Sequence, residues 1–177
     1  MNERVNKYLK VLINLLWGNA LLLSLLTNSL LFILFFLLFS PNYGAVDDIL
    51  MIKQLVGFYG AQPTVFVLYI NILISGILQK LYLLMPGIIW YPILMYLIHF
   101  FGMIAIFYAF LGQKNDPIKI LLYLFLFTAF ELPQLLSLTF TTTAFVAAMG
   151  GMFLLLRVIV REERFGQNNT TVAFGLA

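Results

Sequence analysis

The sequence predicts an all-α membrane protein with about four transmembrane helices, an interfacial helix and a membrane-dipping juxtamembrane helix. Hydrophobic residues make up 63% of the 177 residues and charged residues only 10%, whereas a soluble domain carries charge on about a quarter of its positions. Long apolar runs recur along the chain, and about 20 apolar residues suffice to cross a bilayer. The lysines and arginines gather at the ends of these runs. We therefore expect a single polytopic domain, residues 1–177, with the lipid bilayer as its partner.

The composition also excludes several classes of function. The chain has no cysteine, which removes disulfides and thiolate metal sites. Its net charge of +3 is spread over segment ends rather than gathered in a patch, so no nucleic-acid partner is predicted. The basic start at residues 1–10 precedes an apolar run that is too long for a signal peptide.

Four apolar runs predict the crossings: residues 11–39, 91–111, 118–132 and 140–160. Pro41 and Gly44 end the first, and Pro133 breaks the third. In the last run, 140–160, Ala147 and Gly151 are small residues at a spacing that permits close helix packing.

The polar stretch between the first two crossings forms a loop at residues 40–91. From Asp47 onward its apolar residues fall on one helical face, which predicts a short amphipathic helix that lies along the interface and ends at Gly60 and Pro63. Residues 64–84 are long enough to cross but contain Asn71 and Lys80.

The distribution of basic residues decides whether residues 64–84 cross. If they dip into the outer leaflet without crossing, eight of the ten lysines and arginines lie on the inner side and only Lys53 and Lys80 lie outside. This arrangement follows the positive-inside rule. It predicts four crossings, two cytoplasmic termini, and an outer face that carries Asp47, Asp48 and Glu131.

These three carboxyl groups are the candidate reactive residues. One of Asp47 and Asp48 can cap the helix that starts at Ile49. Alternatively, one of these two carboxylates acts as a general base or as a ligand of a divalent metal ion. Glu131 lies in an apolar context, where a carboxylate is costly unless it is paired or reaches water. It can bond to Gln134 or water beside Pro133, or share a site with the aspartates.

His99 is the chain's only histidine and lies in an apolar run. Without a cysteine or second histidine to share a metal, it predicts a hydrogen bond between helices. The hydroxyl groups at 139 and 141–143 are expected to bond mainly to their own helix.

Several short motifs together resemble the start of the GT-C class of polytopic glycosyltransferases, especially bacterial membrane proteins of that type. An Asp-Asp pair follows the first span, and an aromatic, proline-containing belt follows the dipping segment. The matching residues are Asp47-Asp48 with Met51, Tyr69-Ile70-Asn71, Gly76 to Leu78, Leu81-Tyr82, Pro86, Trp90-Tyr91, and Phe140 to Ala144.

The resemblance implies sugar transfer from a polyprenyl-phosphate donor on the outer face of a bacterial cytoplasmic (inner) membrane. Asp47 and Asp48 would then be catalytic, and Asp48 with Glu131 would hold a divalent metal ion. Asn71 and Gln134 would contact the substrate.

The resemblance covers only the N-terminal portion of the family's usual length. Residues 161–177 predict a cytoplasmic tail that runs into a truncated helix, so we expect little activity from this portion alone. The alternative is a non-catalytic small subunit, or a truncated remnant, that packs its helices against a membrane protein partner.

Overall fold

The computed structural model describes residues 18–44, 46–57, 63–111 and 116–174, with side chains of the last helix described as far as Arg161. Four helical stretches in this part of the chain are long and apolar enough to cross a membrane. They have 19–22 residues and therefore extend about 30 Å, the thickness of a hydrocarbon core. They are α2 (Ala20–Leu38), α5 (Trp90–Leu111), the continuous stretch Pro117–Leu136, and the apolar part of α8, Phe140–Arg161. The predicted fold class is confirmed, and the protein is an integral membrane protein.

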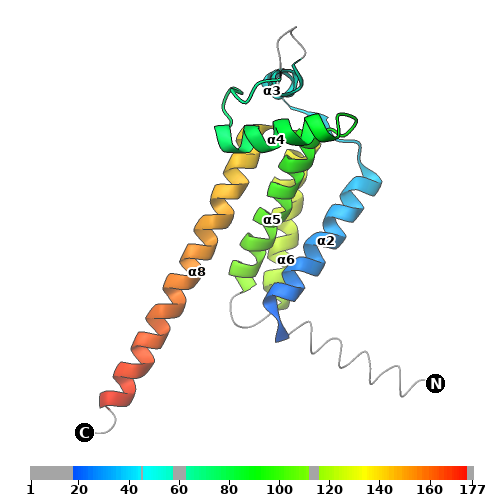
Figure 1. Ribbon diagram of the computed structural model, residues 1–177. Coiled ribbons are helices and arrows are strands. Elements are labelled where there is room, and N and C mark those ends of the chain that lie inside the picture. Colours follow the sequence, from blue (N-terminus) through cyan, green and yellow to red (C-terminus); the bar gives the residue numbers. More distant parts are fainter. Residues whose placement is uncertain (1–17, 45, 58–62, 112–115, 175–177) are drawn as a thin grey trace, which may run out of the picture.

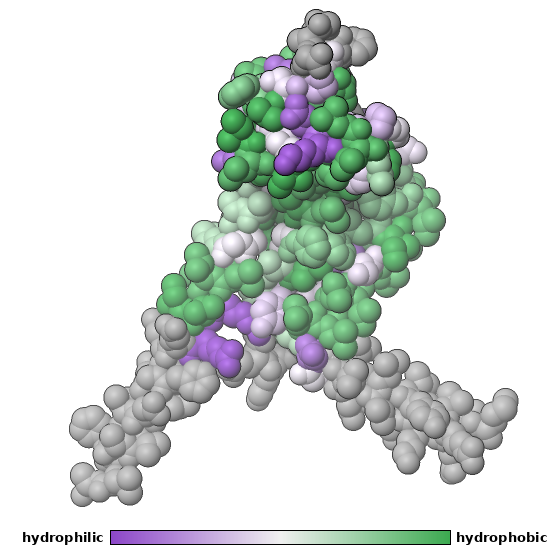
Figure 2. Space-filling model, in the orientation of Figure 1, coloured by the Kyte–Doolittle hydropathy of each residue, from purple (hydrophilic) through white to green (hydrophobic). Residues whose placement is uncertain are grey.

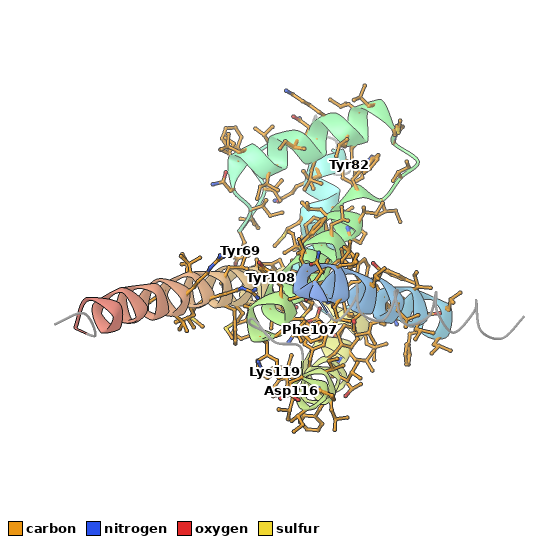
Figure 3. All side chains as sticks on the ribbon, turned by 90° about the horizontal axis from the view of Figure 1, so that it is seen from below. Tyr69, Tyr82, Phe107, Tyr108, Asp116 and Lys119 are labelled. Carbon is orange, nitrogen blue, oxygen red and sulfur yellow. The ribbon has the colours of Figure 1, made fainter. Side chains whose placement is uncertain are left out.

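Helix α5 is the centre of the bundle and packs against both α8 and α2. Those two helices diverge from α5 in opposite directions (Figures 1 and 3). The start of α2 and the far end of α8 lie at the same end of the bundle (Figure 1). This agrees with an even number of crossings.

Helix α2 begins where the sequence provides a cap. The side chain of Asn19 accepts a hydrogen bond from the backbone N–H of Leu22 at 3.1 Å, which satisfies one of the four N–H groups that a helix start leaves unpaired. The described crossing of 19 residues is about as long as a bilayer requires, and residues 11–17 of the predicted run 11–39 lie outside the described part.

Helices α5 and α8 approach closely because glycine faces the contact on both sides. A Cβ on Gly102 would lie 2.7 Å from Cγ1 of Val146, and one on Gly150 would lie 3.1 Å from the carbonyl oxygen of Gly102. Small residues bring backbones together in this way in membranes. The predicted partner Gly151 is not used, because a Cβ there would meet nothing within 4 Å.

The third crossing does not break at Pro133 as predicted. It continues from α6 (Pro117–Leu126) through a π-helical turn, η1 (Phe127–Glu131), into α7 (Leu132–Leu136). The N–H of Leu132 bonds to the carbonyl of Phe127, five residues back. A proline lacks the N–H that the next α-helical bond requires, and the wider turn accommodates it.

Helix α8 also runs further than predicted. It extends from Phe140 to Phe174 as one helix, although we expected a crossing that ended at 160 and a separate helix after 171. Arg and Glu are good helix formers, so the charged residues after the apolar part continue the helix instead of ending it. Residues 175–177 lie outside the described part.

An end cap, made of β1 (Asn42–Tyr43), α3 (Val46–Val56) and α4 (Ile72–Leu84), lies across one end of the bundle (Figure 1). Strand β1 pairs in parallel with β2 (Ser137–Leu138). A Cβ on Gly44 would lie 2.9 Å from the carbonyl oxygen of Ser137, so this approach requires glycine. The 13 residues of α4 extend about 20 Å, too short to cross, as predicted.

The surface agrees with this arrangement (Figure 2). Hydrophobic side chains cover the sides of the bundle, and hydrophilic residues gather on the end cap and at the opposite end. At the opposite end, Arg157 lies over the ring of Tyr108, 3.6 Å from its centre. The amino group of Lys119 donates to the carbonyl of Leu111 at 2.9 Å and so completes the end of α5.

Candidate functional site

Asp48 is a carboxyl group that is buried within the end cap. The residue is 0% exposed, although it belongs to a short helix at the end of the bundle. Its Oδ1 accepts a hydrogen bond from the hydroxyl of Tyr91 at 2.7 Å and another from the backbone N–H of Phe140 at 3.1 Å. Its Oδ2 is buried and has no hydrogen-bond partner among the described residues.

The two donors show how the fold positions this side chain. Tyr91 lies at the start of α5, and its own backbone N–H donates to the hydroxyl of Tyr82 on α4 at 3.1 Å. Phe140 is the first residue of α8, and its N–H is one of the groups that the helix start leaves unpaired. Asp48 therefore caps α8, not the helix in which it lies.

Burial raises the pKa of Asp48, because it removes water from the charged form. The hydrogen bonds from Tyr91 and Phe140 oppose this effect, and the nearby charge of Asp47 adds to it. A buried carboxyl group with a raised pKa and one oxygen without a partner has the properties of a general base.

Asp47 has a different environment. It lies in the first turn of α3 and is exposed. We expected one aspartate to cap a helix that begins at Ile49, but α3 already begins at Val46, and both aspartates lie inside its first turn. The structure therefore separates the pair into one exposed and one buried carboxyl group.

An aromatic stack lies directly beside Asp48. The ring of Tyr69 stacks on that of Phe140, with 5.1 Å between centres and 4° between planes. Tyr69 is 70% exposed. Its φ of 61° is a conformation that bulky side chains rarely adopt. The residue whose N–H binds Asp48 thus also carries the ring on which the exposed Tyr69 stacks.

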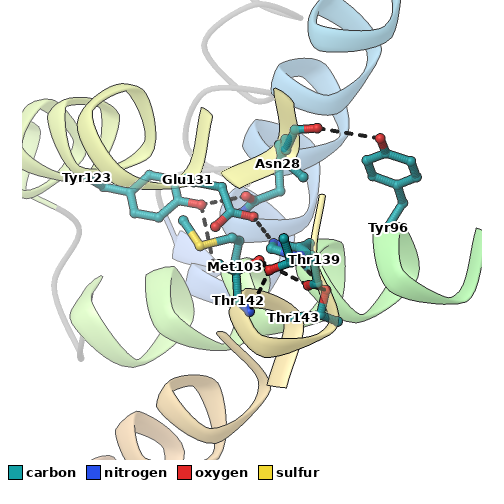
Figure 4. A network of polar contacts seen from close by, with 10 residues as sticks. Asn28, Tyr96, Met103, Tyr123, Glu131, Thr139, Thr142 and Thr143 are labelled. Atoms are coloured by element: carbon teal, nitrogen blue, oxygen red, sulfur yellow. Dashed lines mark hydrogen bonds and ion pairs between the residues drawn. The ribbon is translucent and has the colours of Figure 1, made fainter. Parts of the chain in front are cut away.

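Glu131 lies in a second buried cluster. Its Oε1 is 2.7 Å from Nδ1 of His99, and Nε2 of His99 is 3.1 Å from the hydroxyl oxygen of Thr143 (Figure 4). All three side chains are at most 4% exposed. The predicted hydrogen bond of His99 to a neighbouring helix is confirmed. Glu131 bonds neither to Gln134 nor to the aspartates among the described contacts.

The two clusters are separate along the bundle. Asp48 binds Tyr91 and Glu131 binds His99, and these partners lie eight residues apart on α5, a rise of about 12 Å. The described residues contain no group of three His, Cys, Asp or Glu that could hold a metal ion. The predicted metal ligands Asp48 and Glu131 thus lie in two separate clusters.

The two predicted substrate-binding residues have different places. Asn71 caps α4, since its side chain accepts from the N–H of Leu73 at 2.9 Å. Gln134 lies in α7, and its Oε1 is buried without a partner among the described residues. The structure gives Asn71 a structural role and leaves Gln134 with an unused acceptor.

Sequence reasoning did not identify Tyr91 as a partner of Asp48 or His99 as a partner of Glu131. A signal was present for the second pair, because His99 and Glu131 are both ionisable groups in apolar runs, and such groups usually pair with one another. No comparable signal pointed to Tyr91.

The fold and these clusters define a polytopic α-helical membrane protein with a buried carboxyl group at the end of its bundle. No family model matches the chain, and no curated protein and no solved structure is similar to it.

Proposed function

We propose that this chain is part of a membrane glycosyltransferase in which Asp48 is the general base. The observation that carries the proposal is the buried Asp48, whose Oδ2 has no hydrogen-bond partner among the described residues. It lies at the end of the bundle, where a membrane-bound donor and a water-soluble acceptor can meet. The donor is a polyprenyl-phosphate sugar, by resemblance to the GT-C class.

In this reaction Oδ2 of Asp48 takes the proton of the acceptor hydroxyl. The acceptor oxygen forms a bond to the anomeric carbon, and the bond from that carbon to the phosphate breaks, so that polyprenyl phosphate leaves with the electron pair. Because Asp48 is 0% exposed, the acceptor reaches Oδ2 only when α3 moves. Glu131 takes no part in this step, because it contacts His99 and shares no site with Asp48 among the described contacts.

The test is an assay, in membrane vesicles, of the longer glycosyltransferase of which this chain is proposed to be a part, with a radiolabelled polyprenyl-phosphate hexose as donor. Asp48→Asn is expected to lower transfer by about 10²–10⁴-fold, the usual contribution of a general base. Asp47→Asn is the matched control and is expected to leave transfer unchanged, since that side chain is exposed. Equal rates for the parent and Asp48→Asn would remove Asp48 from the reaction.

We also propose that the end cap faces the outside of a bacterial cytoplasmic membrane and that both termini are cytoplasmic. The count of basic residues supports this orientation. Because the chain has no cysteine, the single variants Ile88→Cys and Asn115→Cys can be probed with an impermeant thiol reagent. Intact cells should label Ile88→Cys alone, and labelling of Asn115→Cys alone would reverse the orientation.

A second candidate is a non-catalytic subunit that binds a membrane protein partner through α8. Only 17% of the most apolar window of that helix is buried, and Gly151 faces open space. Exposed small residues permit close helix packing. Photocrosslinkers at Ala147 and Phe145 should capture a partner from native membranes, and crosslinks to lipid alone would reject this candidate.

A further inference from the structure

The buried cluster of His99, Glu131 and Thr143 has no part in the proposed transfer reaction. It joins three elements of the bundle, because His99 belongs to α5, Glu131 to η1 and Thr143 to α8. The positions of the hydrogen atoms in such a cluster follow from which atoms can donate and which can only accept.

Thr143 determines the protonation of one ring nitrogen. Its hydroxyl oxygen lies 2.8 Å from the backbone carbonyl oxygen of Thr139. A carbonyl oxygen only accepts, so the single hydroxyl proton of Thr143 must lie in this contact. Towards His99, 3.1 Å away, the hydroxyl oxygen can then only accept. Nε2 of His99 therefore carries a proton.

The contact on the other side of the ring requires a second proton. Nδ1 of His99 and Oε1 of Glu131 are 2.7 Å apart, and two lone pairs do not approach so closely without a hydrogen between them. Whether nitrogen or oxygen holds this proton, the imidazole and carboxyl group together hold two. The pair then has no net charge.

We infer that His99, Glu131 and Thr143 form a proton-binding site inside the membrane-spanning bundle, in which one proton is held between the imidazole and the carboxyl group. A neutral histidine beside an ionised glutamate would hold one proton fewer and leave a negative charge in the bundle. The apolar surroundings oppose such a charge.

Among the described residues, the groups around this site supply no other positive charge. The hydroxyl of Tyr123 on α6 is uncharged and donates to Asn28 on α2 (Figure 4). The described cations of α6 and α8 are engaged at the far end of the bundle, where Lys119 binds the Leu111 carbonyl and Arg157 lies over Tyr108. The shared proton is thus what neutralises the carboxyl group.

The site can be tested directly because the chain contains a single histidine. An untagged full chain with ¹⁵N-labelled histidine in lipid nanodiscs gives one pair of ring-nitrogen NMR signals. At pH 7 we expect Nε2 to be protonated and Nδ1 to be in a strong hydrogen bond. An unprotonated Nε2 would overturn the inference, because Thr143 would then donate to the ring and the pair would be charged.

Three variants separate this arrangement from a merely buried histidine. Glu131→Gln should keep the Nε2 proton and remove the strong-hydrogen-bond signal of Nδ1. Thr143→Val should change the Nε2 signal, and Thr143→Ser should restore it. Thr142→Val is the matched control, since its hydroxyl bonds to Thr139 and not to His99. Unchanged ring signals in both Glu131→Gln and Thr143→Val would overturn the site.

Discussion

Asp48 and Glu131 are both buried carboxyl groups, but the two regions in which they lie give them different hydrogen-bond partners. Glu131 lies inside the bundle and faces the imidazole of His99 at 2.7 Å. Asp48 lies in the end cap and has only uncharged donors, the hydroxyl of Tyr91 and the N–H of Phe140, on one of its oxygens. The other oxygen has no partner among the described residues.

The difference separates a carboxyl group with a histidine partner from one that keeps an oxygen without a partner among the described residues. In the bundle, the partner of Glu131 neutralises its charge and ties three elements together. In the end cap, burial raises the pKa of Asp48 and leaves an acceptor available. Perturbed acids with an unused oxygen are candidates for chemistry, whereas a paired acid among apolar helices stabilises one arrangement of those helices.

The largest expected effect comes from removing the partner of Glu131. His99→Leu should destabilise the protein by about 3–5 kcal/mol, because it leaves a buried carboxyl group unpaired. The double variant His99→Leu with Glu131→Leu should recover most of that loss, since apolar residues can replace a buried pair. Unfolding in mixed micelles measures the free energy of unfolding of both variants. An equal loss in His99→Leu and in the double variant would show that the two residues are not coupled.

Removing one donor to Asp48 should have a smaller effect. Tyr91→Phe deletes the hydrogen bond to the carboxyl group and should cost about 1.5–3 kcal/mol of unfolding free energy, typical for a bond to a charged acceptor. Tyr96→Phe is the control, because the hydroxyl of Tyr96 makes only a long bond of 3.4 Å to the Leu135 carbonyl. A loss as large in the control would mean that ring packing, and not the carboxylate bond, is measured.

The pH dependence of stability should distinguish the end cap from the rest of the protein. The pKa of Asp48 is raised above 3.8 by burial, so the folded state holds its proton more tightly than the unfolded state. The stabilising contribution of Asp48 to the free energy of unfolding is complete below pH 3.8 and is lost as the pH rises through the folded-state pKa. Each unit of difference is worth about 1.4 kcal/mol.

Asp48→Asn should remove this decline. The difference in unfolding free energy between the parent and this variant, measured from pH 3.5 to 7, isolates the contribution of Asp48 from other titrating groups. A difference that does not change with pH would show that Asp48 titrates normally.

The smallest expected effects concern two glycines of the end cap. Gly44→Ala should destabilise by about 1–3 kcal/mol through overpacking, since its Cβ would lie 2.9 Å from the Ser137 carbonyl oxygen. Gly76→Ala should stabilise by about 0.5–1 kcal/mol, because this helical glycine has nothing within 4 Å of the added Cβ. The two melting temperatures should move in opposite directions.

The sequence alone predicts the crossings and the non-crossing element. Length and apolarity predict the crossings, and both are local properties. The non-crossing element is predicted from the distribution of basic residues along the whole chain. The predicted C-terminal ends of the third and fourth crossings were wrong. Pro133 indicated a break, but a π-turn accommodates it, and the charges after Val160 do not end α8.

The tertiary structure alone decides which partners each buried carboxyl group meets. Asp48 and Phe140 are 92 residues apart in the chain, and His99 and Glu131 are 32 apart. Periodicity and composition describe what each segment buries, but they do not specify which buried polar groups meet. That depends on the close approach of α5 and α8 at Gly102 and on the packing of the end cap over the bundle.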